Sequence, residues 1–136
     1  LLGGRSDLPR HFLVSAGLAV SAGSGLANFI GLAKEVGDSD GGSGFSFADL
    51  AADRAGVRLG EMAVVNRNSA LKLQTLLAGV RNEAEFMPAV DNLPEQIMAL
   101  EFKRRYSDFD SQTYQLIDAE IENRIDNCRL YRINSH

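Results

Sequence analysis

The chain has 136 residues, of which 45% are hydrophobic and 24% charged, and its formal net charge is −4. This length fits one domain with a core of its own, and the composition excludes a wholly disordered chain. The acidic balance argues against nucleic-acid binding, because the single dense basic run, at 103–105, has acidic residues on both sides. We therefore predict a single domain, residues 1–136, that does not bind nucleic acid.

Six helices are predicted in chain order from apolar periodicity and capping signals. Pro9 suits the first turn of the first helix, Ser46 with Asp49 forms a capping box for the third, and Asn68 caps the fourth. The first predicted helix follows a cap at Ser6 or Asp7 and ends near residue 22. The others span 26–36, 46–66, 69–78, 94–106 and 111–130, with a short helical turn within 83–87. The residues between them have the turn-forming composition of connectors.

No segment has the period of two that a half-buried strand requires. The predicted fold class is therefore all-α: a single compact bundle of five to six helices with a glycine-rich helix–loop–helix near residues 37–46. The stretch 12–33 carries no charge and is long enough to span a bilayer. Its glycine and serine content favours buried helices, with a membrane-associated segment as the alternative.

Small residues recur at every fourth position in two parts of the chain. They are Gly17, Ser21 and Gly25 early in the chain, and Ala52, Gly56 and Gly60 after the glycine-rich loop. A glycine inside a helix costs about 1 kcal/mol relative to alanine, so each series needs a reason. We expect the two series to pack face to face and to let the helix backbones approach closely.

Acidic residues flank the glycine-rich loop. Asp38, Asp40 and Asp49 stand at positions 1, 3 and 12 of a twelve-residue segment between two helices, which are carboxylate positions of an EF-hand loop. Two other positions depart from that pattern, since one lacks a side-chain oxygen and another lacks the required glycine. The alternative is a glycine-rich turn in which Asp49 belongs to the cap of the next helix.

Further polar residues are expected to join this loop. Asp49 and Asp53 project from one helix face, and antiparallel packing would bring Glu35 of the preceding helix towards them. His11 joins them if the first helix packs on the helix after the loop. Such a cluster can bind a divalent cation or act as a base. The candidate metal ligands are His11, Asp38, Asp40, Asp49 and Asp53, and the candidate cofactor is a divalent cation. The alternative is that neighbouring lysine and arginine side chains neutralise these acids in surface ion pairs.

One ordered set of residues resembles a known family. The set is His11-Phe12, an apolar small-residue stretch, Lys34-Glu35, Asp38, Gly44-Phe45-Ser46, Asp49-Leu50, Asp53 and Gly56. It resembles a family of uncharacterised bacterial periplasmic proteins, some of them predicted lipoproteins, whose domain has no assigned function. The resemblance covers residues 8–60. It implies a periplasmic or cell-envelope location, membrane proximity through an anchor upstream of residue 1, and a common site for His11, Glu35, Asp49 and Asp53.

Three classes of function follow from this reading. The first is a small envelope protein of unknown activity whose His/acidic cluster binds a cation or stabilises the fold. The second is a hydrolase of an envelope polymer such as peptidoglycan. It is implied by a fainter resemblance to lysozyme-like folds, with Glu35 as general acid and Asp49 or Asp53 as base or ligand. The third is an interaction module that docks an envelope protein or a second copy through the isoleucine stripe of its C-terminal helix, at 117, 121 and 125. Such a stripe is more often part of a core.

Overall fold

The computed structural model describes the backbone of residues 5–41, 44–107 and 109–132, and their side chains except those of 24, 26, 29 and 36–41. Within these residues the chain is mostly helical and has no strand, only isolated bridge residues such as Phe45 and Ile97, so the predicted all-α class is confirmed. The helices are α1 (Asp7–Ala22), α2 (Ser24–Gly41), α3 (Phe47–Val64), α4 (Arg67–Ala78), the 3-10 helix η1 (Glu83–Glu85), α5 (Ala99–Tyr106), α6 (Gln112–Asp126) and α7 (Arg129–Arg132).

Two helices after the loop begin at side-chain caps. The Asp49 amide donates a hydrogen bond of 3.1 Å to Ser46 Oγ at the start of α3, as the capping box predicts. The start of α4 differs from the prediction, because Asn66 rather than Asn68 is the N-cap. The Asn66 backbone is extended (φ −167°), which lets its side chain accept the Ser69 amide at 2.8 Å.

The glycine-rich loop is shorter than predicted, because α2 continues to Gly41 instead of ending near residue 36. The predicted start of the loop is therefore helical, and the last described part of the connection before α3 is 44–46. A glycine such as Gly37 lowers helix stability by about 1 kcal/mol but does not by itself end a helix. Among the described helices, none combines the length and apolar character that a membrane span needs.

The C-terminal helices also begin or end at other residues than predicted. The fifth predicted helix starts at Ala99, because the residues before it are non-helical and pair with the α2–α3 connection. The Phe45 amide donates to the Ile97 carbonyl at 2.7 Å, the Ile97 amide donates back at 2.9 Å, and Gln96 has a φ of 55° that a helix does not allow. The sixth predicted helix is divided into α6 and α7 around Asn127.

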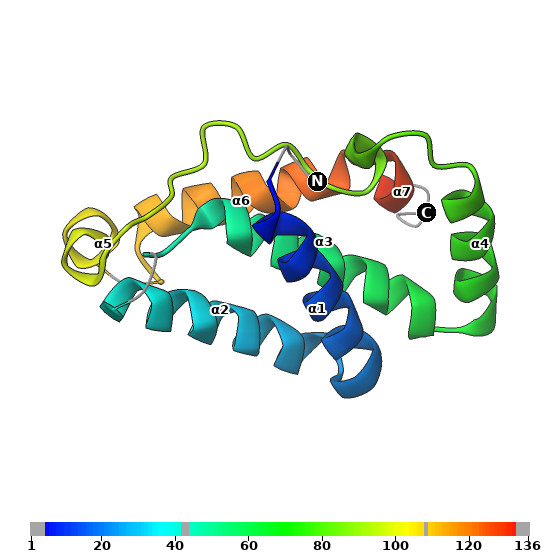
Figure 1. Cartoon of the computed structure of the whole chain (residues 1–136), viewed down its shortest axis with the longest axis horizontal. Helices are drawn as coiled ribbons and strands as arrows, with labels where there is room; N and C mark the ends of the chain where they lie inside the picture. Colours follow the sequence, from blue (N-terminus) through cyan, green and yellow to red (C-terminus); the bar gives the residue numbers. More distant parts are fainter. Residues whose placement is uncertain (1–4, 42–43, 108, 133–136) are drawn as a thin grey trace.

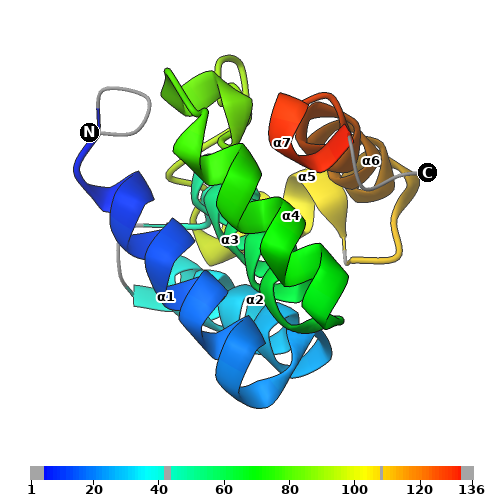
Figure 2. The ribbon, with the colours of Figure 1, turned by 90° about the vertical axis from the view of Figure 1, so that its right-hand side faces the viewer.

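Helix α3 lies at the centre of the fold (Figure 1). Helix α1 crosses its face, α2 runs alongside, and α6 lies on the side away from α2, while α4 and α5 are at opposite ends. Figure 2, viewed from the α4 end, shows the α1–α2 pair and the α6–α7 pair on opposite sides of the molecule. The buried side chains of α3 therefore contact helices on both of its sides.

Aromatic side chains fix the start of α3. The Phe45 and Phe47 rings have centroids 4.9 Å apart, and both lie within 6.5 Å of the Tyr114 ring of α6. Phe47 also packs on Tyr106 of α5, at 5.4 Å between centroids. Aromatic pairs at these separations attract each other beyond their area burial. The segment around Ser46 is therefore held between α5, α6 and α3, which positions its backbone amide.

Helices α1 and α3 approach so closely that side chains are excluded at two glycines of α3. A Cβ atom on Gly56 would lie 2.1 Å from the Phe12 carbonyl oxygen, and one on Gly60 would lie 2.7 Å from the Ala16 carbonyl oxygen. The prediction for the α3 face is confirmed. The prediction for the α1 face is wrong, because a Cβ on Gly17 would meet nothing within 4 Å. The face of α1 that contacts α3 therefore does not include Gly17.

The isoleucine stripe of the C-terminal helix belongs to the core. Ile121 and Ile125 are completely buried, and Ile117 packs against the same cluster. These side chains cover the central helix of their own domain. An interaction through this stripe would require the domain to open.

Candidate functional site

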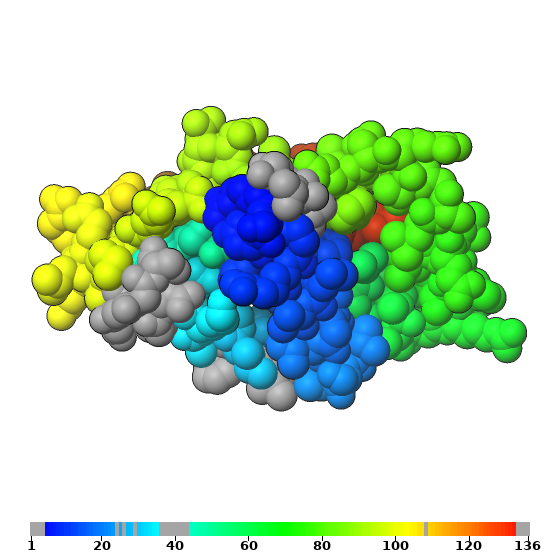
Figure 3. All heavy atoms as spheres, in the orientation of Figure 1, coloured from blue at the N-terminus to red at the C-terminus, as the bar shows by residue number. Residues whose placement is uncertain are grey.

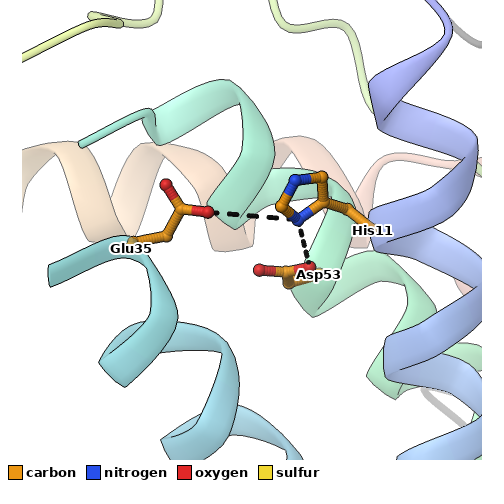
Figure 4. A group of neighbouring side chains, drawn as sticks. All are labelled: His11, Glu35 and Asp53. Atoms are coloured by element: carbon orange, nitrogen blue, oxygen red, sulfur yellow. Dashed lines mark hydrogen bonds and ion pairs between the residues drawn. The ribbon is translucent and has the colours of Figure 1, made fainter. Parts of the chain in front are cut away.

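The predicted polar residues meet where α1, α2 and α3 pack together. Figure 4 shows His11 of α1, Glu35 of α2 and Asp53 of α3 pointing towards one another. His11 Nδ1 lies 3.0 Å from Asp53 Oδ1 and 3.9 Å from Glu35 Oε1. The other ring nitrogen, Nε2, lies 3.4 Å from Oδ2 of Asp49, one turn before Asp53 on α3. One histidine is thus surrounded by carboxylates from two other helices.

These groups are buried, which makes their charges costly. His11, Asp49 and Asp53 are each less than 9% exposed, and Glu35 is 0% exposed. A buried carboxylate stays ionised only where hydrogen bonds or opposite charges replace the water it has lost. The alternative prediction, in which these acids form ion pairs on the surface, therefore does not describe this cluster.

Each of two carboxylates has one satisfied oxygen and one oxygen without a partner. The Ser46 amide donates to Glu35 Oε2 at 3.1 Å, and the Ser15 hydroxyl donates to Asp53 Oδ1 at 3.0 Å. Glu35 Oε1 and Asp53 Oδ2 are buried and have no hydrogen-bond partner among the described residues. An unpartnered buried acceptor costs about 1–3 kcal/mol, so these oxygens call for a proton, a water or a cation.

Burial also changes the proton affinities of the cluster. Loss of water raises the pKa of Glu35 to about 7, although the Ser46 amide opposes this, and raises the pKa of Asp49 to about 6. The hydrogen bond to Asp53 raises the pKa of His11 against the opposing effect of burial. In the absence of a cation, the cluster therefore retains protons at a pH where an exposed carboxyl group would have lost them.

A second set of polar contacts surrounds the cluster. Arg5 Nη2 lies 3.5 Å from Asp49 Oδ1, and Arg5 also pairs with Asp7 and Glu95. The sequence does not predict the contact of Arg5, because Arg5 is 44 residues from Asp49 and no local spacing links the two. Ser15 was not among the predicted site residues either. The one signal for Ser15 is its position one helical turn after His11.

A cleft gives access to the cluster from solvent. It has a volume of about 280 Å³, lies between α1 and α2, and has α3 as its floor. His11, Ser15 and Asp53 form its polar part. Glu35 is completely buried and does not belong to its lining. A molecule in the cleft can therefore contact the histidine and the aspartate directly.

The remaining predicted ligands, Asp38 and Asp40, have helical backbones within α2. Their side chains lie outside the described residues. Because 38–41 belong to α2 and 47–49 to α3, the backbone does not form a twelve-residue EF-hand loop from 38 to 49. The structure brings together His11, Glu35, Asp49 and Asp53, a set that the sequence had grouped through helix packing and family resemblance.

A comparison of the chain with protein-family models, curated proteins and solved structures found no match. The site is therefore interpreted from its own chemistry.

Proposed function

We propose that the protein binds a divalent metal ion of the zinc type at His11, Glu35 and Asp53. Each residue offers one ligand atom, and these atoms all lie within 4.8 Å of one another. A mixed set of imidazole nitrogen and carboxylate oxygens suits zinc and neighbouring transition metals better than calcium or magnesium, which prefer oxygen ligands alone. Small side-chain movements would bring these atoms to the bond lengths of zinc, about 2.0–2.2 Å.

The observation that carries the proposal is the pair of buried oxygens without partners, Glu35 Oε1 and Asp53 Oδ2. The two oxygens come from different helices and lie beside one histidine, an arrangement that helix capping does not require. A bound cation would satisfy both and would neutralise the carboxylates that burial destabilises. It would also connect α1, α2 and α3, which supply one ligand each.

Asp49 supports the same proposal in a different role. It lies beside His11 Nε2, while Nδ1 faces Asp53 and Glu35. Histidines that bind metals usually donate their other ring N–H to a carboxylate, which fixes the ring orientation and strengthens the ligand. Asp49 is held in turn by Arg5. We assign Asp49 as a positioning residue and the other three as ligands.

Three protein ligands leave one coordination position of a tetrahedral zinc ion open. His11 and Asp53 line the cleft, so this position would be accessible from solvent. The hydrolase remains the second candidate, because a pKa of about 7 suits Glu35 to general acid catalysis. A general acid must contact its substrate, however, and Glu35 is 0% exposed. Metal binding is therefore the better-supported function.

The proposed cellular location has a different basis. We infer a periplasmic or cell-envelope protein, with membrane proximity through an upstream anchor, from the sequence resemblance alone. An envelope protein partner and a homo-oligomer are proposals that rest instead on the isoleucine stripe of the C-terminal helix, in which Ile121 and Ile125 are completely buried. Metal binding does not depend on any of them.

Thermal melts of the EDTA-treated protein test the metal site. We expect Zn²⁺ to raise the melting temperature by about 5–10 °C, because a ligand at one hundred times its Kd stabilises by about 2.7 kcal/mol. Mg²⁺ and Ca²⁺ should have little effect. Glu35→Gln should abolish the response, and Glu61→Gln, an exposed site on the same protein, should preserve it. A melting temperature that no ion changes, or an equal response in both variants, would refute the proposal.

Two substitutions at aspartates separate the ligand from the positioning residue. Asp53→Asn should remove zinc binding, because it replaces a ligand. Asp49→Asn should weaken zinc binding by about 10–100-fold, the usual effect of removing the carboxylate that orients a histidine ligand. Calorimetric titration with Zn²⁺ measures both. Equal losses in the two variants would contradict the division of roles.

A glycine of α2 provides a variant that crowds the site without removing a ligand. A Cβ atom on Gly31 would lie 3.2 Å from Asp53 Oδ2, one of the oxygens without a partner. Alanine favours a helix by about 1 kcal/mol over glycine, so Gly31→Ala should not lower the stability of the metal-free protein by much. We expect it to reduce zinc affinity at least about tenfold, measured by the same titration. Unchanged affinity would show that the ion does not use Oδ2.

A further inference from the structure

The cleft between α1 and α2 has a composition that metal binding does not explain. We propose that it binds a small amphiphilic anion, a hydrocarbon chain that carries one carboxylate. Its apolar walls come from Val14 and Leu18 of α1 and Ile30 of α2, and its cationic residues are Arg10 and Lys34. This site goes beyond the proposed metal function and does not require the ion.

The apolar and cationic residues lie at different ends of the cleft. Leu18 and Ile30 are the lining residues nearest in sequence to the α1–α2 junction, where the two helices meet. Arg10 and Lys34 are further from that junction along the two helices. The cleft therefore changes from apolar near the junction to polar at the other end, where Arg10 and Lys34 are the basic residues and His11 and Asp53 also belong to the lining. This arrangement matches a hydrocarbon chain with a charged head.

Two of the apolar side chains that line the cleft are exposed to solvent. Val14 is 56% exposed and Ile30 is 39% exposed. Figure 3 shows α1 and α2 next to each other on the face turned to the viewer. Isolated exposed apolar side chains are common, but these line a concavity of about 280 Å³. A hydrocarbon chain would cover them and remove their apolar surface from water.

The basic residues of the cleft favour a ligand with an anionic head group over one with a neutral or cationic head group. Arg10 makes no ion pair or hydrogen bond with the described side chains, so its guanidinium is able to donate two parallel hydrogen bonds to a carboxylate. The charge of Lys34 acts on His11, which places it close to the polar part of the cleft. The acids of the cluster are mostly behind this lining, and Asp53 alone belongs to it.

The dimensions limit the ligand to a short chain. Arg10 and Leu18 are eight positions apart on α1, about 12 Å at the rise of an α-helix. The volume is at the lower end of small-molecule pockets. A medium-chain carboxylate such as octanoate fits these limits, whereas a polymer or a two-chain lipid would extend out of the cleft.

Isothermal titration calorimetry of the EDTA-treated protein with octanoate tests this inference apart from the metal site. We expect octanoate to bind saturably. The affinities for octanol and octyltrimethylammonium should be at least about tenfold lower than for octanoate, since losing one charge-assisted hydrogen bond accounts for such a factor. Ile30→Trp should abolish binding by filling the cleft. Its control is Val20→Trp, which places the same ring at an exposed position of α1 outside the lining.

A second pair of variants tests the head group. Arg10→Gln should weaken octanoate binding about three- to tenfold, whereas Arg67→Gln, the same charge change at an exposed position of α4, should leave it unchanged. Equal binding of octanoate and octyltrimethylammonium, or unchanged binding by Ile30→Trp, would overturn the proposal. So would binding to phosphatidylglycerol vesicles without binding to octanoate, because the surface would then recognise a membrane. A wild-type protein that binds octanoate but does not bind Zn²⁺ would refute the metal site alone.

Discussion

Glu35→Gln is expected to raise the melting temperature of the metal-free protein at pH 8 and to flatten its dependence on pH. Burial raises the pKa of Glu35 from 4.5 to about 7 in the folded protein. The folded state therefore binds this proton more tightly than the unfolded state, and its contribution to stability is complete below pH 4.5. It is lost as the pH rises towards 7. Above that pH the domain holds a buried carboxylate without a cation.

The size of this effect follows from the difference in proton affinity. A pKa change from 4.5 to about 7 corresponds to about 3 kcal/mol. For a chain of this length that is about 5–10 °C in melting temperature. Glutamine keeps the shape of the side chain and can still accept the Ser46 amide, so the variant loses the charge rather than the contact.

Two other groups add to the decline of stability with pH and should persist in the variant. The pKa of Asp49 is raised to about 6 by burial, and the pKa of His11 is raised by its bond to Asp53. The His11 contribution is present below its unfolded pKa and is lost as the pH passes its folded pKa. All three contributions therefore decrease as the pH rises from about 5 to 8.

Melting curves at several pH values between 5 and 8, with EDTA present, measure the effect. Glu61→Gln provides the control for a charge removed from the surface. A wild-type protein that is more stable at pH 8 than at pH 5 would show that Glu35 remains ionised in the folded state. At pH 8, Zn²⁺ should restore the melting temperature of the wild-type protein. It should not change the melting temperature of Glu35→Gln, because the ion requires the carboxylate.

The sequence was sufficient to predict those features that depend on interactions between residues close together in the chain. Ser46 could be identified as a cap because its interaction with Asp49 lies within one helical turn. Gly56 and Gly60 could be identified as a close-packing face because glycine inside a helix needs a reason. The membership of His11, Glu35, Asp49 and Asp53 in one site also followed from the sequence, but only by assuming which helices pack.

The features that the sequence did not predict depend on contacts between residues far apart in the chain. The late start of α5 results from the pairing of Phe45 with Ile97, and no property of residues 94–98 alone indicates that pairing. The extension of α2 to Gly41 made the expected EF-hand spacing irrelevant, because a helix places residues 38–41 differently from a loop. Arg5 and its contact with Asp49 depended on the tertiary packing of α1 over α3.

The packing of α1 on α3 therefore determines whether the site exists, and Gly56→Ala should disrupt it. The added Cβ would lie 2.1 Å from the Phe12 carbonyl oxygen, a backbone atom that can move only if α1 moves. We expect a loss of at least about 2 kcal/mol, seen as a fall of about 5 °C or more in melting temperature, together with loss of the zinc response because His11 moves away from Asp53. Gly17→Ala is the matched control, since its Cβ would meet nothing within 4 Å and alanine favours the helix. It should leave the melting temperature unchanged or higher. Similar melting temperatures for the two variants would mean that α1 packs on α3 through a different face.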